Sequence, residues 1–243
     1  MVKVRRLKPL PASIFIEGFP GVGLAGYIAA KYIAEKLNME PVAFVTSKRT
    51  QPIVTISQGR ILYPITIYGN GEAYILVAES FVPPEIIGEV ASVIFDEFID
   101  SKNVKLGISL GGSAVMQMLS EERKISFIAS SEPAKRIVKE KLDVSEIQNG
   151  IIMGLTAGLL SEAYMRREDY IVLLAEADPT KPDPIASLAL VKAINKLLDR
   201  NVDTKDLEKA ISDIEAQHKR LHNHIKEQLK KSGVDEISHL YYV

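Results

Sequence analysis

A glycine-rich loop near the N-terminus has the residue spacing of a phosphate-binding site. Gly21, Gly23 and Gly26 follow the pattern G-x-G-x-x-G, between a predicted strand at residues 12–18 and a predicted helix at 22–37. In dinucleotide-binding folds such a loop holds a pyrophosphate on backbone N–H groups at a helix N-terminus. One interpretation is therefore an enzyme that binds NADP or another nucleotide through Gly21–Gly26.

The residues after the second predicted strand, at 41–46, do not complete that fingerprint. An acidic residue is expected there to bind the ribose hydroxyls, but the chain continues with Ser47, Lys48 and Arg49. NADP would fit only if Lys48 and Arg49 bound its 2′-phosphate. The other interpretation is structural: the loop glycines, with Gly18 before them, let a helix pack closely on the first strand.

Other polar groups also follow predicted strands. Gly111, Gly112 and Ser113 form either an anion-binding nest or a tight turn. Two pairs of acidic residues, Asp178 with Asp183 and Glu79 with Glu176, are either paired carboxylates or helix caps and ion-pair partners. Asp183 precedes Pro184, which fits an N-cap followed by a first helical residue.

The distribution of histidine and cysteine excludes the common catalytic constellations from most of the chain. The four histidines, His218, His222, His224 and His239, all lie beyond residue 217, and there is no cysteine or tryptophan. The preceding residues therefore lack a Ser-His-Asp triad, a thiol nucleophile and a His or Cys metal site. We expect no catalytic residue, no metal and no cofactor. His218 and His222 lie four residues apart, which suits either a solvated helix face or a chelating pair.

Composition indicates a folded protein without an electrostatic preference for nucleic acid or membranes. The 243 residues include 30 basic and 31 acidic side chains, and 47% are hydrophobic. Such a balance attracts neither nucleic acid nor an anionic membrane. The longest apolar stretch, near Gly150–Leu160, is shorter than the ~20 residues that span a bilayer. We expect a cytoplasmic protein.

Alternating strands and helices predict a three-layer α/β sandwich with a mainly parallel central sheet. A hairpin is expected over 53–56 and 61–68, and further strands and helices follow in alternation. The remaining strands are predicted at 73–79, 105–110, 125–129 and 170–176, and the helices at 83–101, 132–141, 150–165 and 184–198. Residues 1–203 form the predicted α/β domain. Residues 204–243 form a helical tail with a heptad-like apolar seam.

Four motifs in this order resemble the proteasome assembly chaperone family. They are Phe19-Pro20-Gly21-Val22-Gly23-Leu24-Ala25-Gly26, Gly111-Gly112, the glycine-rich start of the helix at Gly150–Leu160, and Pro182-Asp183-Pro184-Ile185-Ala186. The resemblance covers about residues 8–200. It implies a nucleoside-phosphorylase-like sandwich without established catalysis, self-association, and binding to proteasome α-subunits.

The chain ends in Leu240-Tyr241-Tyr242-Val243. Hydrophobic–Tyr–any residue at a C-terminus resembles the docking peptides of proteasome activators. A free carboxylate needs a cation or a backbone nest, and the penultimate tyrosine supplies a rigid aromatic ring with a polar hydroxyl. One short tail binds weakly, so several copies are needed. We therefore predict a homo-oligomer, a tetramer or pentamer rather than a dimer, that assists proteasome assembly or activates the proteasome.

Overall fold

The computed structural model describes residues 1–49, 54–57, 59–79, 82–99, 104–116 and 122–211. The chain divides into two compact units, Met1–Asp203 and Thr204–Val243. In the second unit the described part is residues 204–211. A helix occupies 205–211, and Thr204 opens it: its carbonyl accepts the Glu208 N–H at 2.9 Å.

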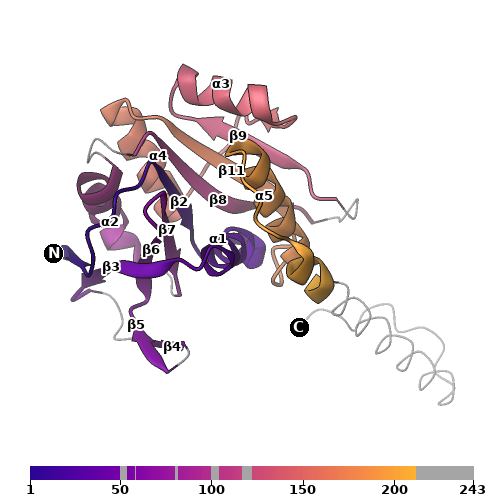
Figure 1. Ribbon diagram of the computed structural model, residues 1–243. Helices are drawn as coiled ribbons and strands as arrows, with labels where there is room; N and C mark the ends of the chain where they lie inside the picture. Colours follow the sequence, from indigo (N-terminus) through magenta and orange to yellow (C-terminus); the bar gives the residue numbers. More distant parts are fainter. Residues whose placement is uncertain (50–53, 58, 80–81, 100–103, 117–121, 212–243) are drawn as a thin grey trace, which may run out of the picture. The chain divides into compact units, whose positions relative to one another are not determined.

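A mixed sheet, nine-stranded in the described residues, runs through the first unit in the order β1-β3-β6-β7-β2-β8-β11-β9-β10 (Figure 1). Its strands are β1 (Val2–Arg6), β2 (Ile14–Gly18), β3 (Glu40–Ser47), β6 (Ile65–Gly69), β7 (Ala73–Ala78), β8 (Leu106–Ala114), β9 (Ile125–Ala129), β10 (Ser145–Glu146) and β11 (Tyr170–Ala177). The four central strands, β7, β2, β8 and β11, are parallel to one another. Antiparallel pairing flanks them on both sides, through β6 and through β9.

Helices cover both faces of this sheet, which confirms the predicted three-layer α/β sandwich (Figure 1). They are α1 (Ala25–Lys36), α2 (Ile87–Ile94), α3 (Glu132–Lys141), α4 (Gly154–Arg166) and α5 (Pro184–Leu197). Helices α1 and α5 pack together on one face, and α2 and α4 pack together on the other. Among the described residues, no helix has the length and apolar character needed to cross a membrane.

The side chains of β2 show how the strand alternation assigns the two faces. Phe15, fully buried, belongs to the core that contains residues of α2 and α4. Gly18, three residues on, lies against α1, because a Cβ there would meet Ala30 Cβ at 2.4 Å. Successive strand residues point to opposite faces. Glu17 therefore shares the face of Phe15, beneath α2 and α4.

Two predicted segments differ from the structure. The hairpin is β4 (Thr55–Ser57) with β5 (Arg60–Leu62), a separate two-stranded sheet, and the second predicted strand is broken before β6. Pro64 lies at the break; it has no N–H for a ladder, and its carbonyl accepts the Glu79 N–H at 2.7 Å. The helix expected at 83–101 is a 3₁₀ turn, then α2, then a wider turn at Phe95–Ile99.

Candidate functional site

The loop between β2 and α1 lies at the carboxyl edge of the sheet, where the parallel strands β7, β2, β8 and β11 end. Gly23 has φ of +60°, a region that favours glycine. A Cβ on Gly23 would also lie 2.8 Å from Ala177 Cβ and 3.1 Å from Asp183 Cβ. The Gly23 carbonyl accepts the Asp183 N–H at 2.7 Å. The first glycine motif and the loop after β11 are therefore packed directly together.

Other glycines of the predicted motifs complete the same packing. A Cβ on Gly26 would lie 1.8 Å from the Leu110 carbonyl oxygen, and one on Gly112 would lie 2.2 Å from the Val22 carbonyl oxygen. A Cβ on Gly18 would meet the Gly26 carbonyl oxygen at 2.3 Å. Gly111 lies on the other face of β8, where a Cβ would meet Leu174 at 2.9 Å. We call the packed region beside α1 the glycine junction: Gly18, Gly23, Gly26, Gly112 and Asp183. It holds α1 against β2 and β8.

This packing bears on the nucleotide interpretation. In the dinucleotide fingerprint, the second glycine lets the backbone approach the pyrophosphate. Here that glycine, Gly23, approaches Ala177 and Asp183 instead. At Gly21, by contrast, a Cβ would meet only the Phe19 carbonyl oxygen, at 4.0 Å. Of the two cations proposed for a 2′-phosphate, Arg49 forms an ion pair with Glu89. The geometry favours a structural role for the loop.

Asp183 links three segments at the junction. Its carboxylate accepts the Ala186 N–H at 3.0 Å, which is the predicted N-cap of α5, and the Asp178 N–H at 3.1 Å. The same carboxylate pairs with the Arg123 guanidinium at 3.1 Å, and both side chains are at most 5% exposed. Removing either partner of a buried ion pair of this kind strongly destabilises the folded state.

The structure does not bring the other candidate carboxylates together as catalytic pairs. Glu79 on the β7 side binds the Lys31 ammonium at 3.0 Å and the Tyr27 hydroxyl. Burial alone would lower the pKa of Lys31, but hydrogen bonds to Tyr27 and Glu79 raise it above its usual value. Glu176 extends from β11, three strands away in the sheet order, or roughly 14 Å at the usual strand spacing.

The Asp178 side chain forms hydrogen bonds within the turn that follows it. Its carboxylate accepts the Thr180 hydroxyl at 2.6 Å and the Thr180 N–H at 2.8 Å. These hydrogen bonds lower the pKa of Asp178. Asp178 thus remains an ionised turn-forming residue, while Asp183 is held by Arg123.

A buried carboxyl that the sequence analysis did not single out lies beside the junction. Glu17 is fully buried on β2, and the Thr156 hydroxyl of α4 donates to its Oε2 at 3.2 Å. Ser109 on the neighbouring strand β8 is also fully buried, and its hydroxyl lies 2.9 Å from that of Tyr170. Glu17 Oε1 has no hydrogen-bond partner among the described residues.

Burial raises the pKa of Glu17 to about 7, although hydrogen bonds with Ser109, Thr156 and the Phe19 backbone act in the opposite direction. The carboxyl therefore carries a proton over much of the acidic range. The sequence signal was a charged residue inside the apolar segment Ile14-Phe15-Ile16-Glu17-Gly18. The strand was predicted, but the helix that buries Glu17 was not placed by the sequence.

The predicted docking residues, Leu240, Tyr241, Tyr242 and Val243, lie outside the described residues. So do the four histidines. In the part of the chain that is described, no group of three His, Cys, Asp or Glu side chains is arranged to hold a metal ion.

The fold and the glycine junction define a class of protein: three-layer α/β domains in which the glycine-rich loop before α1 packs against the loop after β11. Within that class, the chain belongs to the PAC2 family, whose model matches residues 15–222. It is 31% identical over 219 residues to the protein MJ0106 of Methanocaldococcus jannaschii, covering 90% of this chain and 89% of that one.

Two solved structures from Pyrococcus furiosus are similar over most of the chain. PbaA, described as an archaeal homolog of proteasome-assembly chaperone, has 32% identity and a TM-score of 0.86, with 95% of this chain and 96% of PbaA covered. PbaB, described as an archaeal proteasome activator, has 24% identity and a TM-score of 0.78, with 91% and 98% covered. The likeness to PbaB shows the fold alone. The PAC2 family match and the similarity to PbaA confirm the predicted family resemblance, while the predicted C-terminal docking motif remains a prediction.

Proposed function

We propose that this chain is a proteasome-binding protein, an assembly chaperone or an activator, that self-assembles through its α/β body and docks its C-terminal tails on the α-ring of the core particle. The observation that carries the proposal is the 32% identity to PbaA across 95% of this chain. The filled glycine junction supports a binding rather than a catalytic role, since the position that would approach a pyrophosphate is taken by Ala177 and Asp183.

The chemistry of docking resides in the last four residues. The Val243 carboxylate needs a cation or a set of backbone N–H groups, and a pocket between two α-subunits supplies such a partner. The Tyr242 ring fills apolar space while its hydroxyl forms a hydrogen bond. Leu240 and Tyr241 add apolar contact. A tetramer or pentamer presents several such tails at once, which raises the effective concentration of each.

Co-sedimentation with purified core particle tests the docking step. Deleting Tyr241–Val243, or changing Tyr242→Ala, is expected to abolish binding. Adding one glycine after Val243 keeps every side chain but displaces the carboxylate, and it is expected to do the same. Tyr164→Ala is the matched control, because Tyr164 is a 72% exposed tyrosine on α4. Undiminished binding of the truncated chain would refute tail docking.

The two forms of the proposal, activator and assembly chaperone, predict different effects on the proteasome. An activator increases peptide hydrolysis by the mature core particle, whereas an assembly chaperone increases the yield of core particles from separate subunits. Both effects are expected to disappear in Tyr242→Ala. The native mass of the chain alone, measured in the same preparations, gives the number of tails available.

A further inference from the structure

Strand β1 leaves one edge of the main sheet open. It comes first in the strand order and pairs only with β3 among the described strands. The N-terminus that leads into it lies at the outer side of the body (Figure 1). An edge strand presents a row of backbone N–H and C=O groups that have no partner strand. Such an edge can accept a further strand from an extended peptide.

The register with β3 identifies which residues of β1 present these groups. The Leu7 N–H donates to the Val42 carbonyl at 2.8 Å, so Leu7 faces β3. Residues that face the partner alternate along an antiparallel strand, and the register of β1 is continuous. Val2 and Val4 therefore direct their backbone groups away from β3. The Val2 N–H accordingly donates to the Glu89 carboxylate at 2.5 Å, and Val4 is the next outward residue.

The side chains of β1 divide between the two faces of the sheet. Val2 is buried in the core beneath α2, and Val4 packs against the same core. Because successive strand residues point to opposite faces, Lys3 and Arg5 project on the other face, and both are exposed. The open edge therefore combines outward backbone groups at Val4 with a basic side chain on either side of it.

These two basic side chains are not neutralised by acidic neighbours. Glu89 and Glu97 lie beside β1, and each already has a basic partner: Glu89 pairs with Arg49, and Glu97 pairs with Arg6 at 3.2 Å. Within the described part of the chain, Lys3 and Arg5 form no ion pair with an acidic side chain. Two positive charges at alternate positions therefore remain available on the outermost strand.

We propose that β1 binds an extended acidic segment of another protein, which adds to the sheet as an antiparallel strand with the pattern acidic–apolar–acidic. The apolar residue lies opposite Val4 and exchanges two backbone hydrogen bonds with it. Its two acidic neighbours lie opposite Lys3 and Arg5, where opposite charges across a strand pair are favourable. This binding surface goes beyond the tail docking proposed above and does not depend on it.

A second copy of this chain does not fit the same edge. If the β1 strands of two copies paired antiparallel about Val4, Lys3 of each copy would lie opposite Arg5 of the other. If they paired about Lys3, two lysines would face each other. Like charges directly opposite one another destabilise a strand pair, and charged edge strands disfavour pairing between identical sheets. The charge of β1 therefore selects a partner strand of opposite sign.

Two peptides test the charge requirement on the full chain. The first is fluorescein-labelled Ser-Thr-Glu-Val-Glu-Thr-Ser, and the second has lysine in place of both glutamates. Fluorescence anisotropy is expected to show binding of the glutamate peptide and none of the lysine peptide. The double variant Lys3→Glu, Arg5→Glu is expected to bind the glutamate peptide at least about tenfold more weakly. It is expected to bind the lysine peptide instead.

Methylation of one peptide nitrogen separates strand addition from simple charge attraction. A methyl group on the nitrogen of the central valine removes the N–H that donates to the Val4 carbonyl, and it is expected to abolish binding. A methyl group on the nitrogen of the second glutamate changes an N–H that points away from β1. That peptide is expected to bind as the unmodified one does. Both measurements use the wild-type chain, so they do not depend on how a variant folds.

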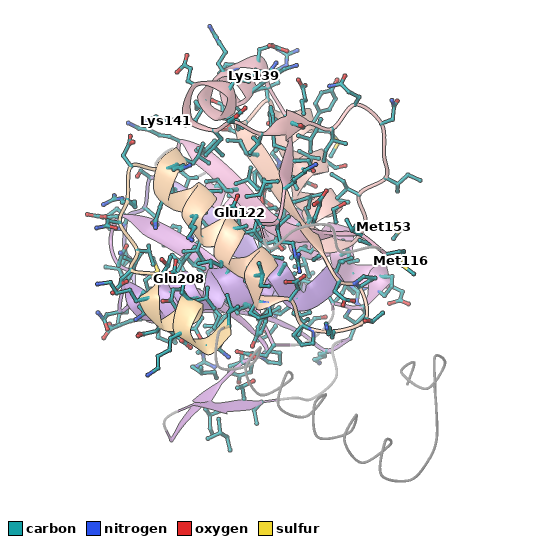
Figure 2. The ribbon with its side chains drawn as sticks, turned by 90° about the vertical axis from the view of Figure 1, so that its right-hand side faces the viewer. Met116, Glu122, Lys139, Lys141, Met153 and Glu208 are labelled. Carbon is teal, nitrogen blue, oxygen red and sulfur yellow. The ribbon has the colours of Figure 1, made fainter. Side chains whose placement is uncertain are left out.

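The matched control for the double variant is Lys124→Glu, Arg136→Glu. Both side chains are exposed. Lys124 immediately precedes β9, and Arg136 lies on α3, which packs on β9 near the other end of the strand order. Figure 2 labels two further residues of this helix, Lys139 and Lys141. The control carries the same change of net charge and is expected to leave peptide binding unchanged.

Several outcomes would overturn the proposal. They are equal binding of the two methylated peptides, equal binding of the glutamate and lysine peptides, and no binding of the glutamate peptide at millimolar concentration. A lower native mass of the folded Lys3→Glu, Arg5→Glu variant would also overturn it, because β1 would then belong to a contact between copies. No proteasome is present in these measurements, so their outcomes are independent of whether the tails dock.

Discussion

The Thr156 hydroxyl of α4 donates a hydrogen bond of 3.2 Å to the Glu17 carboxylate of β2, across the interface between a helix and the centre of the sheet. Glu17 is fully buried, and its Oε1 has no partner among the described residues. The pair joins the start of α4 to the strand that leads into the glycine junction. An ionisable group in this position makes the stability of the body depend on pH.

The first prediction concerns that dependence. Burial raises the pKa of Glu17 from 4.5 to about 7. Between these values the folded chain binds the proton and the unfolded chain does not, so the free energy of unfolding falls as pH rises through this window. The pKa difference corresponds to a loss of about 3 kcal/mol. Glu17→Gln is expected to flatten this part of the profile in denaturant unfolding from pH 4 to 8.

Glu85→Gln is a suitable control for that experiment, since Glu85 is an exposed glutamate at the start of the turn before α2. Its unfolding profile should follow the wild-type profile. Parallel profiles for wild type and Glu17→Gln would show that Glu17 is not the group responsible.

The second prediction concerns the glycine junction. Gly26→Ala would place a methyl group 1.8 Å from the Leu110 carbonyl oxygen, and neither backbone can move far. We expect a loss of at least about 3 kcal/mol in the free energy of unfolding. Gly88→Ala is the matched control: both glycines are the second residue of a helix, and a Cβ on Gly88 meets nothing within 4 Å. It should be neutral or stabilising by up to about 1 kcal/mol. Equal effects of the two changes would contradict the packing argument.

The sequence predicted the elements more reliably than their contacts. The strand at 125–129 and the helix at 132–141 were predicted with the bounds that the structure has, because Ser131 caps the helix and hydrophobic periodicity marks the strand. Gly21 and Gly23 precede α1, as predicted. The anion-binding nest or tight turn predicted at Gly111, Gly112 and Ser113 is wrong, because β8 continues through them to Ala114. The mutual packing of the motif glycines was not predictable, since a spacing of glycines is the same whether a phosphate or another backbone fills the space.

The burial of Glu17 and the exposure of Val54 and Ile56 show a second limit. A single charge in an apolar strand indicates an unusual environment. The helix that covers it, α4, begins more than a hundred residues later in the chain. Val54 and Ile56 lie two residues apart in the strand predicted at 53–56, so both are expected on one side of it. Ordinarily that side faces the core, and here a separate sheet turns it to solvent.

The third prediction concerns the nucleotide interpretation. Because Gly23 packs on Ala177 and Asp183, NADPH, NADH and nucleosides are expected to leave the melting temperature unchanged at millimolar concentration. A ligand at a hundred times its Kd would stabilise the chain by about 2.7 kcal/mol. A saturable shift that is lost in Lys48→Ala would contradict the structural role of the loop and favour NADP binding.

The fourth prediction concerns the buried ion pair of Asp183 and Arg123, whose side chains are 4% and 5% exposed. Asp183→Ala removes the carboxylate that pairs with the buried Arg123 guanidinium and also removes the cap of α5. We expect a loss of about 3–5 kcal/mol. Asp183→Asn separates the two effects, because asparagine is a good N-cap but carries no charge to offset Arg123. It is expected to recover about 1 kcal/mol of that loss, as measured by denaturant unfolding.

Glu40→Ala provides the comparison at the surface: Lys8 and Glu40 form an ion pair with side chains 50% and 61% exposed, so its loss should cost less than about 1 kcal/mol. If Asp183→Ala cost no more than Glu40→Ala, Asp183 would not hold the junction together, and the co-occurrence of the glycine and Pro-Asp-Pro motifs would need another explanation.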